Sequence, residues 1–155
     1  MTETLAAGTN RAFYNVVTTT AEPGEIWRLW TDVTTWKTWD AGLKDAALDD
    51  AFAIGAKGRI IPLSGPSTRF EVTEYNAPDS YAFETRLPFA RLVVRRSLVG
   101  ANPTVFRHDV RFEGLLGGFW AGRFGPGFRA ALPPTMDALV ALAEKGASGG
   151  QSDGE

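Results

Sequence analysis

The stretch GFRAALPPTMDALVALAEKG, residues 127–146, decides the fold that we expect for this chain. Large apolar residues recur in it at steps of three or four, which places them on one stripe of an amphipathic helix: Phe128, Leu132, Met136, Leu139 and Ala143. We therefore expect a long helix from Phe124 to Lys145, with Gly146 as a left-handed cap at its end. A helix with so apolar a face needs a surface to cover.

Two prolines, Pro133 and Pro134, interrupt this helical pattern. A proline inside a helix removes a hydrogen bond and costs about 3 kcal/mol or more. It also disfavours helical geometry in the residue before it. Two alternatives follow. Either the helix bends near Leu132, or a short first helix is followed by a main helix that begins at one of the prolines.

The middle of the chain supplies the surface. Alternation is clearest in Thr104–Glu113, where Phe106, His108, Val110 and Phe112 share one face and charged residues share the other. Strict period two with one charged face predicts an antiparallel sheet that is covered on one side and wet on the other. Weaker patterns of the same kind predict further strands at residues 13–20, 43–49, 59–63, 68–75, 81–87 and 91–99.

Short helices are expected between the first strand and the next. Pro23 suits the first position of a helix, with acidic Glu22 and Glu25 beside its positive end. Asp32 is a candidate N-cap for a second short helix that runs to Thr38. The order of elements predicts an α+β fold, in which one curved antiparallel sheet grips a long C-terminal helix. We place this domain at residues 11–146 and expect residues 1–10 and 147–155 to be flexible tails.

Composition excludes several classes of function. The 155 residues suit one domain, and 16 basic against 18 acidic side chains give a net charge of −2, so we expect no nucleic-acid partner. Without cysteine and with one histidine, the chain offers no disulfide, no thiol nucleophile and no cysteine or multi-histidine metal site. We expect no cofactor, no integral membrane association and, because the N-terminus is not a secretory signal, a cytoplasmic protein.

The stretch PGEIWRLWTDVTTWKTWD, residues 23–40, resembles the signature of the START/Bet v 1-like (SRPBCC) superfamily, nearest to its polyketide cyclase/dehydrase-like branch. Later segments agree with it: Gly55 and Gly58 before a strand, Val72-Thr73-Glu74, Phe83-Glu84-Thr85 and the C-terminal ALPPTMDALVALAEKG. The resemblance covers roughly residues 13–145. It implies a helix-grip fold with a hydrophobic cavity between sheet and helix, in a family of lipid carriers, plant hormone and flavonoid binders and aromatase/cyclases.

Two polar residues fall on the covered face of the sheet. His108 is either a satisfied core histidine, a ligand contact or a general base, and Asp109 points to the opposite face and cannot orient it. Strand parity places Arg96 inward and Arg95 outward. A buried arginine needs an acceptor, which is either Glu74 or an acidic oxygen of a ligand. A β-bulge would reverse this parity.

The glycine-rich segment Gly114–Gly127 also contains Leu115, Leu116, Phe119 and Trp120. We expect it to be a flexible bridge into the long helix. Its apolar side chains then have three alternative roles: they gate the cavity, they contact a partner or a membrane, or they close the core.

The expected function is the binding of a hydrophobic small molecule, a lipid, acyl or polycyclic polyketide-like compound, in the internal cavity. The alternative is a polyketide cyclase/aromatase-like enzyme with His108, Arg96 and Tyr81 as catalytic candidates, and the third is a protein-interaction or regulatory module. The sequence leaves open whether the protein forms a homodimer. The expected ligand-binding residues are Trp36, Trp39, Phe70, Val72, Phe83, Arg96, His108, Val110, Phe112, Trp120, Phe128, Leu132 and Met136.

Overall fold

A computed structural model describes residues 5–153 of the chain, with side-chain burial described to Gly146. Its elements are β1 Ala7–Gly8, β2 Ala12–Thr19, α1 Pro23–Thr31, the 3-10 turn η1 Val33–Thr35, α2 Trp36–Trp39, β3 Leu43–Leu48, β4 Lys57–Pro62, β5 Thr68–Asn76, β6 Ser80–Leu87, β7 Ala90–Ala101, β8 Thr104–Glu113 and α3 Gly117–Asp153. Each strand predicted from the alternating patterns is present, and the α+β helix-grip architecture is confirmed.

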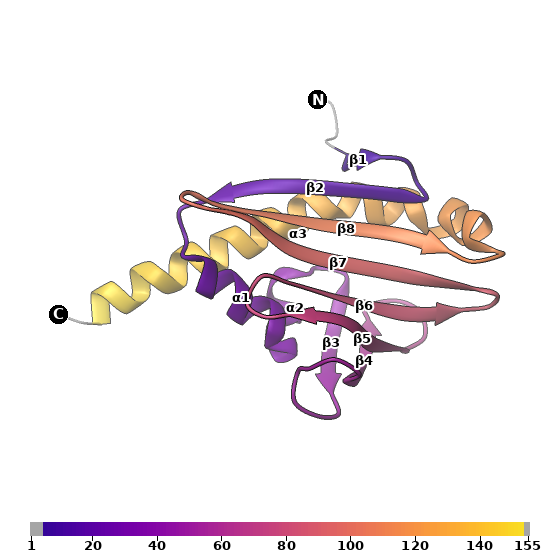
Figure 1. Cartoon of the computed structure of the whole chain (residues 1–155), viewed down its shortest axis with the longest axis horizontal. Helices are drawn as coiled ribbons and strands as arrows, with labels where there is room; N and C mark the ends of the chain where they lie inside the picture. The colour runs from indigo at the N-terminus through magenta and orange to yellow at the C-terminus, as the bar shows by residue number, and fades with distance from the viewer. Residues whose placement is uncertain (1–4, 154–155) are drawn as a thin grey trace.

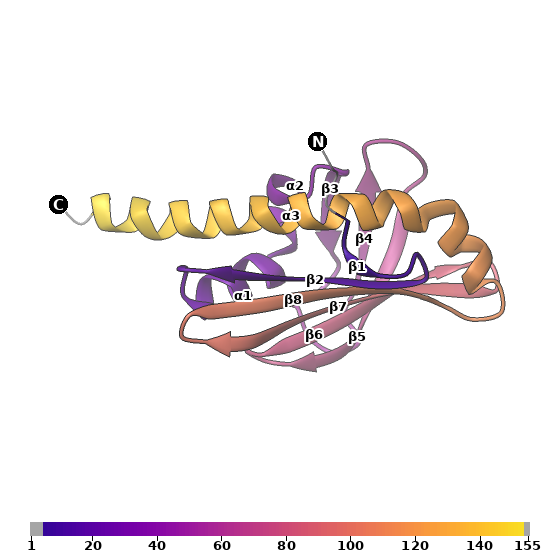
Figure 2. The ribbon, with the colours of Figure 1, turned by 90° about the horizontal axis from the view of Figure 1, so that it is seen from above.

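The eight strands form one antiparallel sheet in the order β1-β2-β8-β7-β6-β5-β4-β3. The first long strand, β2, lies beside the last, β8, so segments about ninety residues apart in the chain are neighbours in the sheet. The sheet curves, and α3 lies across one of its faces (Figure 1, Figure 2). Helices α1 and α2 contact α3 and lie away from the end at which α3 starts (Figure 1).

The alternation in β8 orients its side chains as the sequence predicts. Phe106, His108 and Phe112 are at most 1% exposed and face α3. Arg107 pairs with Asp109 on the outer face, where further ion pairs cross to the neighbouring strands. The outer face is therefore a solvated surface of compensated charges, while the inner face forms the core.

The two short helices begin where the sequence predicts. Pro23 is the first residue of α1, and the Asp32 carboxylate accepts a hydrogen bond from the Thr34 backbone N–H (3.2 Å) at the start of η1. Proline loses nothing at a first helical position, because that N–H has no helical partner. These caps hold Trp30, at the end of α1, and the tryptophans of α2 against the inner face of the sheet.

Helix α3 differs from the expectation at its start. It begins at Gly117, so most of the expected flexible bridge Gly114–Gly127 is helical. The glycines serve close packing instead of flexibility. A Cβ on Gly125 would lie 2.4 Å from the Asn10 carbonyl oxygen, and one on Gly117 would lie 3.0 Å from the Phe112 carbonyl oxygen. Only glycine lets the helix backbone approach the chain before β2 and the end of β8 this closely.

The prolines do not end α3 either. Pro126, Pro133 and Pro134 all lie inside it, and the expected break or new start at residues 132–134 is absent from the described helix. The bend lies nearer the beginning, where the orange turns of α3 meet the remainder at an angle (Figure 2). Gly146 is not a cap, because the helix backbone continues to Asp153. The expected tail 147–155 is described only as this backbone, and residues 1–4 and 154–155 lie outside the described residues.

Pro133 explains why part of the N-terminal segment is docked. Having no N–H, Pro133 leaves the Arg129 carbonyl without its helical donor. The Ala6 backbone N–H donates to this carbonyl (3.1 Å), and the Arg129 side chain donates back from Nε to the Ala6 carbonyl (2.7 Å). Ala6 is buried and β1 pairs with β2, so this part of the segment that we expected to be frayed is fixed.

Candidate ligand-binding site

A row of polar side chains crosses the inner face of the sheet. Asn15 on β2 is in register with His108 on β8, His108 with Arg96 on β7, and Arg96 with Tyr81 on β6. We call these four residues the polar row. Residues directly opposite each other on neighbouring antiparallel strands point their side chains to the same face of the sheet. Strand pairing thus brings together the three residues that the sequence offers as catalytic candidates, His108, Arg96 and Tyr81.

Arg96 is the charged member of the polar row and is only 7% exposed. One guanidinium nitrogen donates to the Tyr81 hydroxyl (2.6 Å). The central guanidinium carbon, Cζ of Arg96, lies 4.8 Å from the centre of the Trp36 ring and 4.9 Å from the centre of the Trp39 ring. Ring faces attract a cation but replace a counter-ion only in part. Among the described residues no carboxylate pairs with Arg96, and its Nε–H has no acceptor.

Glu74, the expected internal partner of Arg96, lies on the outer face. It accepts from Nε of Arg95 (2.8 Å). The reason is a β-bulge: Val72 is opposite Phe83 but Glu74 is opposite Ala82, so the register shifts by one residue between them. A one-residue shift turns the following side chains to the other face. The inward placement of Arg96 and the outward placement of Arg95 follow the predicted parity, and the bulge removes only the carboxylate.

His108 is held as a neutral ring. Nε1–H of Trp30 donates to its Nε2 (2.9 Å), so the proton of the neutral imidazole is on Nδ1. Burial lowers the pKa of His108 well below 6.5, and the nearby positive charge of Arg96 lowers it further. The lone pair that a general base would use is therefore occupied by the Trp30 donor.

Tyr81 connects the polar row to α1. Its hydroxyl donates to the Trp30 carbonyl (3.0 Å) while it accepts from Arg96. Burial raises the pKa of Tyr81 above its usual value of 10.0, and the adjacent Arg96 opposes this shift in part. The phenol stays protonated at neutral pH and is a hydrogen-bond donor already in use.

Aromatic rings form the walls around Arg96. Trp36 packs on Phe70 and Phe83, with ring centres 5.4 Å and 5.3 Å apart. Trp39 lies 6.3 Å from the His108 ring, and its buried Nε1–H has no acceptor. Two buried donors among these aromatic rings, Nε–H of Arg96 and Nε1–H of Trp39, thus have no hydrogen-bond acceptor. An acceptor-bearing ligand is the kind of group that would satisfy both.

The remaining expected ligand-binding residues divide into two groups. Val72, Val110, Leu132 and Met136 are buried in the same core, and Asn15 donates to the Met136 sulfur (3.4 Å). Phe112, Phe128 and Trp120 belong to a separate stack near the start of α3, in which Phe112 lies over Phe128 and Trp120 over Phe124. That stack is away from the polar row, and Phe128 is 43% exposed.

The space between sheet and α3 is occupied by side chains. Two pockets among the described residues lie elsewhere, one on the outer side of β2 and β8 and the other beside the β2–α1 and β7–β8 connections. Neither lies between the sheet and α3, where the resemblance implied a cavity. Trp30, Trp36, Trp39 and Tyr81 are each at most 1% exposed, so bulky rings fill this region.

Two residues of the site have no single-residue signal in the sequence. Trp30 matters through its indole N–H and backbone carbonyl, and Asn15 matters through its register with His108. An alternation pattern gives the face of a residue but not its cross-strand neighbour, which depends on the turns. Among the described residues no cluster of three or more His, Asp or Glu side chains could hold a metal ion. No helix in that part is long and apolar enough to span a bilayer.

Comparison with protein families gives a match over residues 11–144 to the family described as polyketide cyclase / dehydrase and lipid transport. The match covers most of the chain, including all members of the polar row. A search of curated proteins gave no significant match.

Solved structures share the fold at low sequence identity. A protein from Mesorhizobium loti is 19% identical, with a TM-score of 0.70 over 87% of this chain and 98% of its own. The di-domain ARO/CYC BexL from the BE-7585A biosynthetic pathway is 12% identical, with a TM-score of 0.68 over 86% of this chain and 46% of its own. A point mutant of Thalictrum flavum norcoclaurine synthase with a transition-state analogue is 9% identical, with a TM-score of 0.61 over 88% of this chain and 96% of its own.

Proposed function

The chain belongs to the polyketide cyclase/dehydrase and lipid transport family, and we propose that it binds a small apolar molecule through an acidic oxygen, a carboxylate or an enolate, held by Arg96. The ligand would be ring-containing or acyl, since the surroundings of Arg96 are aromatic. Nε–H of Arg96 and Nε1–H of Trp39 would donate to the oxygen.

The observation that carries this proposal is the uncompensated charge of Arg96. A buried cation costs several kcal/mol unless it is paired. Cation–π contacts return about 2 kcal/mol when desolvated, and a neutral phenol adds one hydrogen bond. Retaining an arginine here, where an apolar residue of similar length would pack, is reasonable if the cation is needed for an anionic ligand.

Binding is favoured over turnover because no base in the polar row is free. Nε2 of His108 accepts from Trp30, and the Tyr81 hydroxyl both donates and accepts. A general base needs an available lone pair within reach of the proton that it removes. Both groups would have to leave their present partners before they could act.

The second candidate function is a cyclase, and the family description favours it. In an aldol closure with dehydration, Arg96 would stabilise the developing enolate and Tyr81 would donate a proton to the leaving oxygen. This mechanism needs His108 to release Trp30 and take up a proton. It predicts that Trp30→Phe, which removes the indole N–H, raises turnover, whereas a pure binding protein shows no turnover in either form.

The test is a pair of ligands of equal shape, 2-naphthoate and its amide 2-naphthamide, titrated by calorimetry. We expect wild-type protein to prefer the carboxylate by about 10- to 100-fold, since a hydrogen bond to a charged group contributes about 1.5–3 kcal/mol. Arg96→Met removes the charge and keeps an unbranched apolar side chain. It should abolish the preference while the melting temperature stays equal or rises, because replacing a buried charge with an apolar group is often neutral or stabilising.

Arg95→Met is the matched control, because Arg95 precedes Arg96 on β7 but lies on the outer face with Glu74. This variant should keep the wild-type preference for the carboxylate. The proposal fails if Arg96→Met binds naphthoate as well as Arg95→Met does. It also fails if Arg96→Met unfolds, because Arg96 would then be a structural residue. Native mass spectrometry of freshly purified protein, before and after solvent extraction, would identify any co-purified acid.

A further inference from the structure

Three large apolar side chains stand exposed at one end of the molecule. Phe89 is 74% exposed, Leu115 is 86% exposed and Phe119 is 63% exposed. Phe89 is in the β6–β7 turn, Leu115 is in the β8–α3 connection, and Phe119 is in the first turn of α3. The β6–β7 turn and the β8–α3 connection with the start of α3 lie at the same end of the molecule in two perpendicular views (Figure 1, Figure 2). We call these three residues the end patch.

Hydrogen bonds hold the two segments of the end patch together. The Leu116 backbone N–H donates to the Phe89 carbonyl (2.9 Å), and Nε1–H of Trp120 donates to the Pro88 carbonyl (3.0 Å). Trp120 in turn packs edge-on against Phe119, with ring centres 5.1 Å apart. The exposed rings are therefore presented on a fixed surface, and they are not side chains of a loose loop.

Phe89 is a poor choice for the stability of its turn. Leu87 pairs with Ala90, so Pro88 and Phe89 form a two-residue turn, and Phe89 has a φ of 56°. This left-handed conformation after a proline suits glycine or asparagine, whereas a side chain with a bulky Cβ substituent is strained in it. The sequence instead places an aromatic ring here and exposes it to solvent. Folding does not account for that ring.

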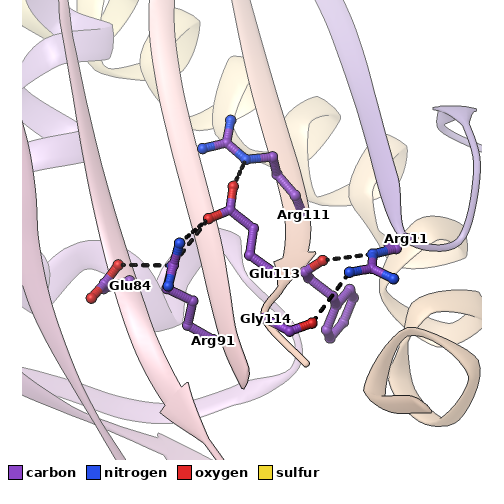
Figure 3. A network of polar contacts seen from close by, with 7 residues as sticks. Arg11, Glu84, Arg91, Arg111, Glu113 and Gly114 are labelled. Atoms are coloured by element: carbon purple, nitrogen blue, oxygen red, sulfur yellow. Dashed lines mark hydrogen bonds and ion pairs between the residues drawn. The ribbon is translucent and has the colours of Figure 1, made fainter. Parts of the chain in front are cut away.

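The charge of this end is opposite to that of the whole chain. Arg11 together with residues 84–91 and 111–123 carries five arginines and two glutamates, a local charge of +3 in a chain of −2. Both glutamates are used within the sheet: Glu113 pairs with Arg91 and Arg111, and Glu84 pairs with Arg91 (Figure 3). Arg11 donates to the carbonyls of Phe112 and Gly114 and to no carboxylate among the described residues. Arg86 and Arg123 likewise have no carboxylate partner in that part of the chain.

We propose that the end patch docks the protein on an anionic phospholipid surface, with Phe89, Leu115 and Phe119 in the headgroup region and the surrounding arginines on lipid phosphates. Exposed apolar side chains with an excess of cations at the same end of the molecule are what such a surface selects. A second copy of this chain is a poorer occupant, because a two-fold contact would bring two ends of charge +3 together. The inference is independent of Arg96 and of any ligand.

The experiment is co-sedimentation of the full chain with vesicles of phosphatidylcholine alone and with vesicles of equal parts phosphatidylcholine and phosphatidylserine. We expect binding to the mixed vesicles that weakens with added salt. Phe119→Ser should weaken it about tenfold, the loss expected for one buried apolar side chain. Arg86→Gln and Arg123→Gln should each weaken it about fivefold on mixed vesicles, in line with the contribution of one surface cation.

Two variants separate docking from folding. Phe89→Asn should weaken vesicle binding about tenfold while its melting temperature stays equal or rises, because asparagine suits the left-handed turn position. Ile54→Ser is the control for lost hydrophobicity, since Ile54 is 69% exposed in the β3–β4 connection. Arg96→Met should bind vesicles like the wild type.

The proposal is overturned if the wild type does not distinguish the two vesicle compositions, or if Phe119→Ser binds as Ile54→Ser does. It is also overturned if light scattering shows a dimer that Phe119→Ser dissociates without any change in vesicle binding. In that case the end patch is a self-association surface.

Discussion

His108 is buried and lies opposite Arg96 on the neighbouring strand, and burial first and this charge second lower the pKa of the histidine. A charged imidazole is costly in a buried site, and a second positive charge beside Arg96 adds to that cost, so the folded protein keeps His108 neutral where an exposed histidine would be protonated. The Trp30 indole N–H reinforces this state because it can donate only to an unprotonated Nε2.

This arrangement predicts how stability depends on pH. Below pH 6.5 the unfolded chain takes up a proton on His108 and the folded protein does not, so the free energy of unfolding falls as the pH falls. The loss should approach about 1.4 kcal/mol per pH unit. Urea unfolding between about pH 5 and 6.5 measures it. The carboxylates with lowered pKa values, such as Glu113, act in a more acid range, below their usual value of 4.5.

The matched variant is His108→Gln, in which the amide oxygen can still accept from Trp30 but nothing titrates. Its stability should be flat over the range in which the wild type loses stability. Equal slopes in the two proteins would show that His108 is not the group responsible.

For single residues, the sequence predicts well which face of the sheet a side chain points to, but it predicts poorly which residue that side chain contacts. Alternation in β7 and β8 correctly predicts that Arg96 and His108 face inward and that Arg95 and Asp109 face outward. It gives the wrong partner for Arg96, because the bulge in β5 depends on how two strands pair and leaves no clear mark in one strand. The burial of His108 is predictable, but its hydrogen bond to Trp30 is not, since Trp30 reaches it from another element.

Among the elements, α3 departs furthest from the sequence prediction. The glycines of residues 117–127 have low helix propensity, which favours a loop when no tertiary contact is considered. Packing overrides propensity here, because those glycines allow the helix to lie directly against the chain before β2. Strands β2 to β8, whose alternation itself expresses their packing, are predicted nearly residue for residue, whereas β1 is not predicted.

The link between α3 and the N-terminal segment predicts the effect of one substitution. Arg129→Ala removes the bond from Nε to the Ala6 carbonyl, and we expect the free energy of unfolding to fall by about 1 kcal/mol. Exchange of the Ala6 amide with solvent, followed by NMR, should become faster. Arg123→Ala is the control, since Arg123 is an exposed arginine of the same helix that does not contact Ala6. Unchanged exchange at Ala6 in Arg129→Ala would contradict this account.

In the whole molecule, side chains fill the space between the sheet and α3, so a ligand reaches Arg96 only if some of them move. Trp36, Trp39 and Phe83 surround the guanidinium and are at most 4% exposed. Access therefore depends on a displacement of α2 or α3 from the sheet, which the free protein makes only transiently.

We therefore predict that association of 2-naphthoate is limited by opening of the protein. In stopped-flow measurements of tryptophan fluorescence, the observed rate should reach a plateau as the ligand concentration rises. Arg95→Met should show the same plateau. A rate that increases linearly up to the highest concentrations would mean that Arg96 is accessible without such a displacement.

The overall fold could be predicted from the strand patterns and from the family resemblance, whereas the end patch could not. A net charge of −2 gives no reason to expect a basic end, because composition averages over a surface on which arginines gather at one end. The filled core also could not be predicted, since the size of the rings facing each other across sheet and helix depends on the three-dimensional packing.

The pairing of β2 with β8 has a consequence for the newly made chain. Ribosomes add about 5–20 residues per second, so β2 leaves the exit tunnel several seconds before its partner strand exists. Helix α3, which covers both strands, is made later still. The apolar face of β2 is thus without cover until β8 and α3 have been made. In a cell, factors that shelter nascent chains would have this interval in which to act.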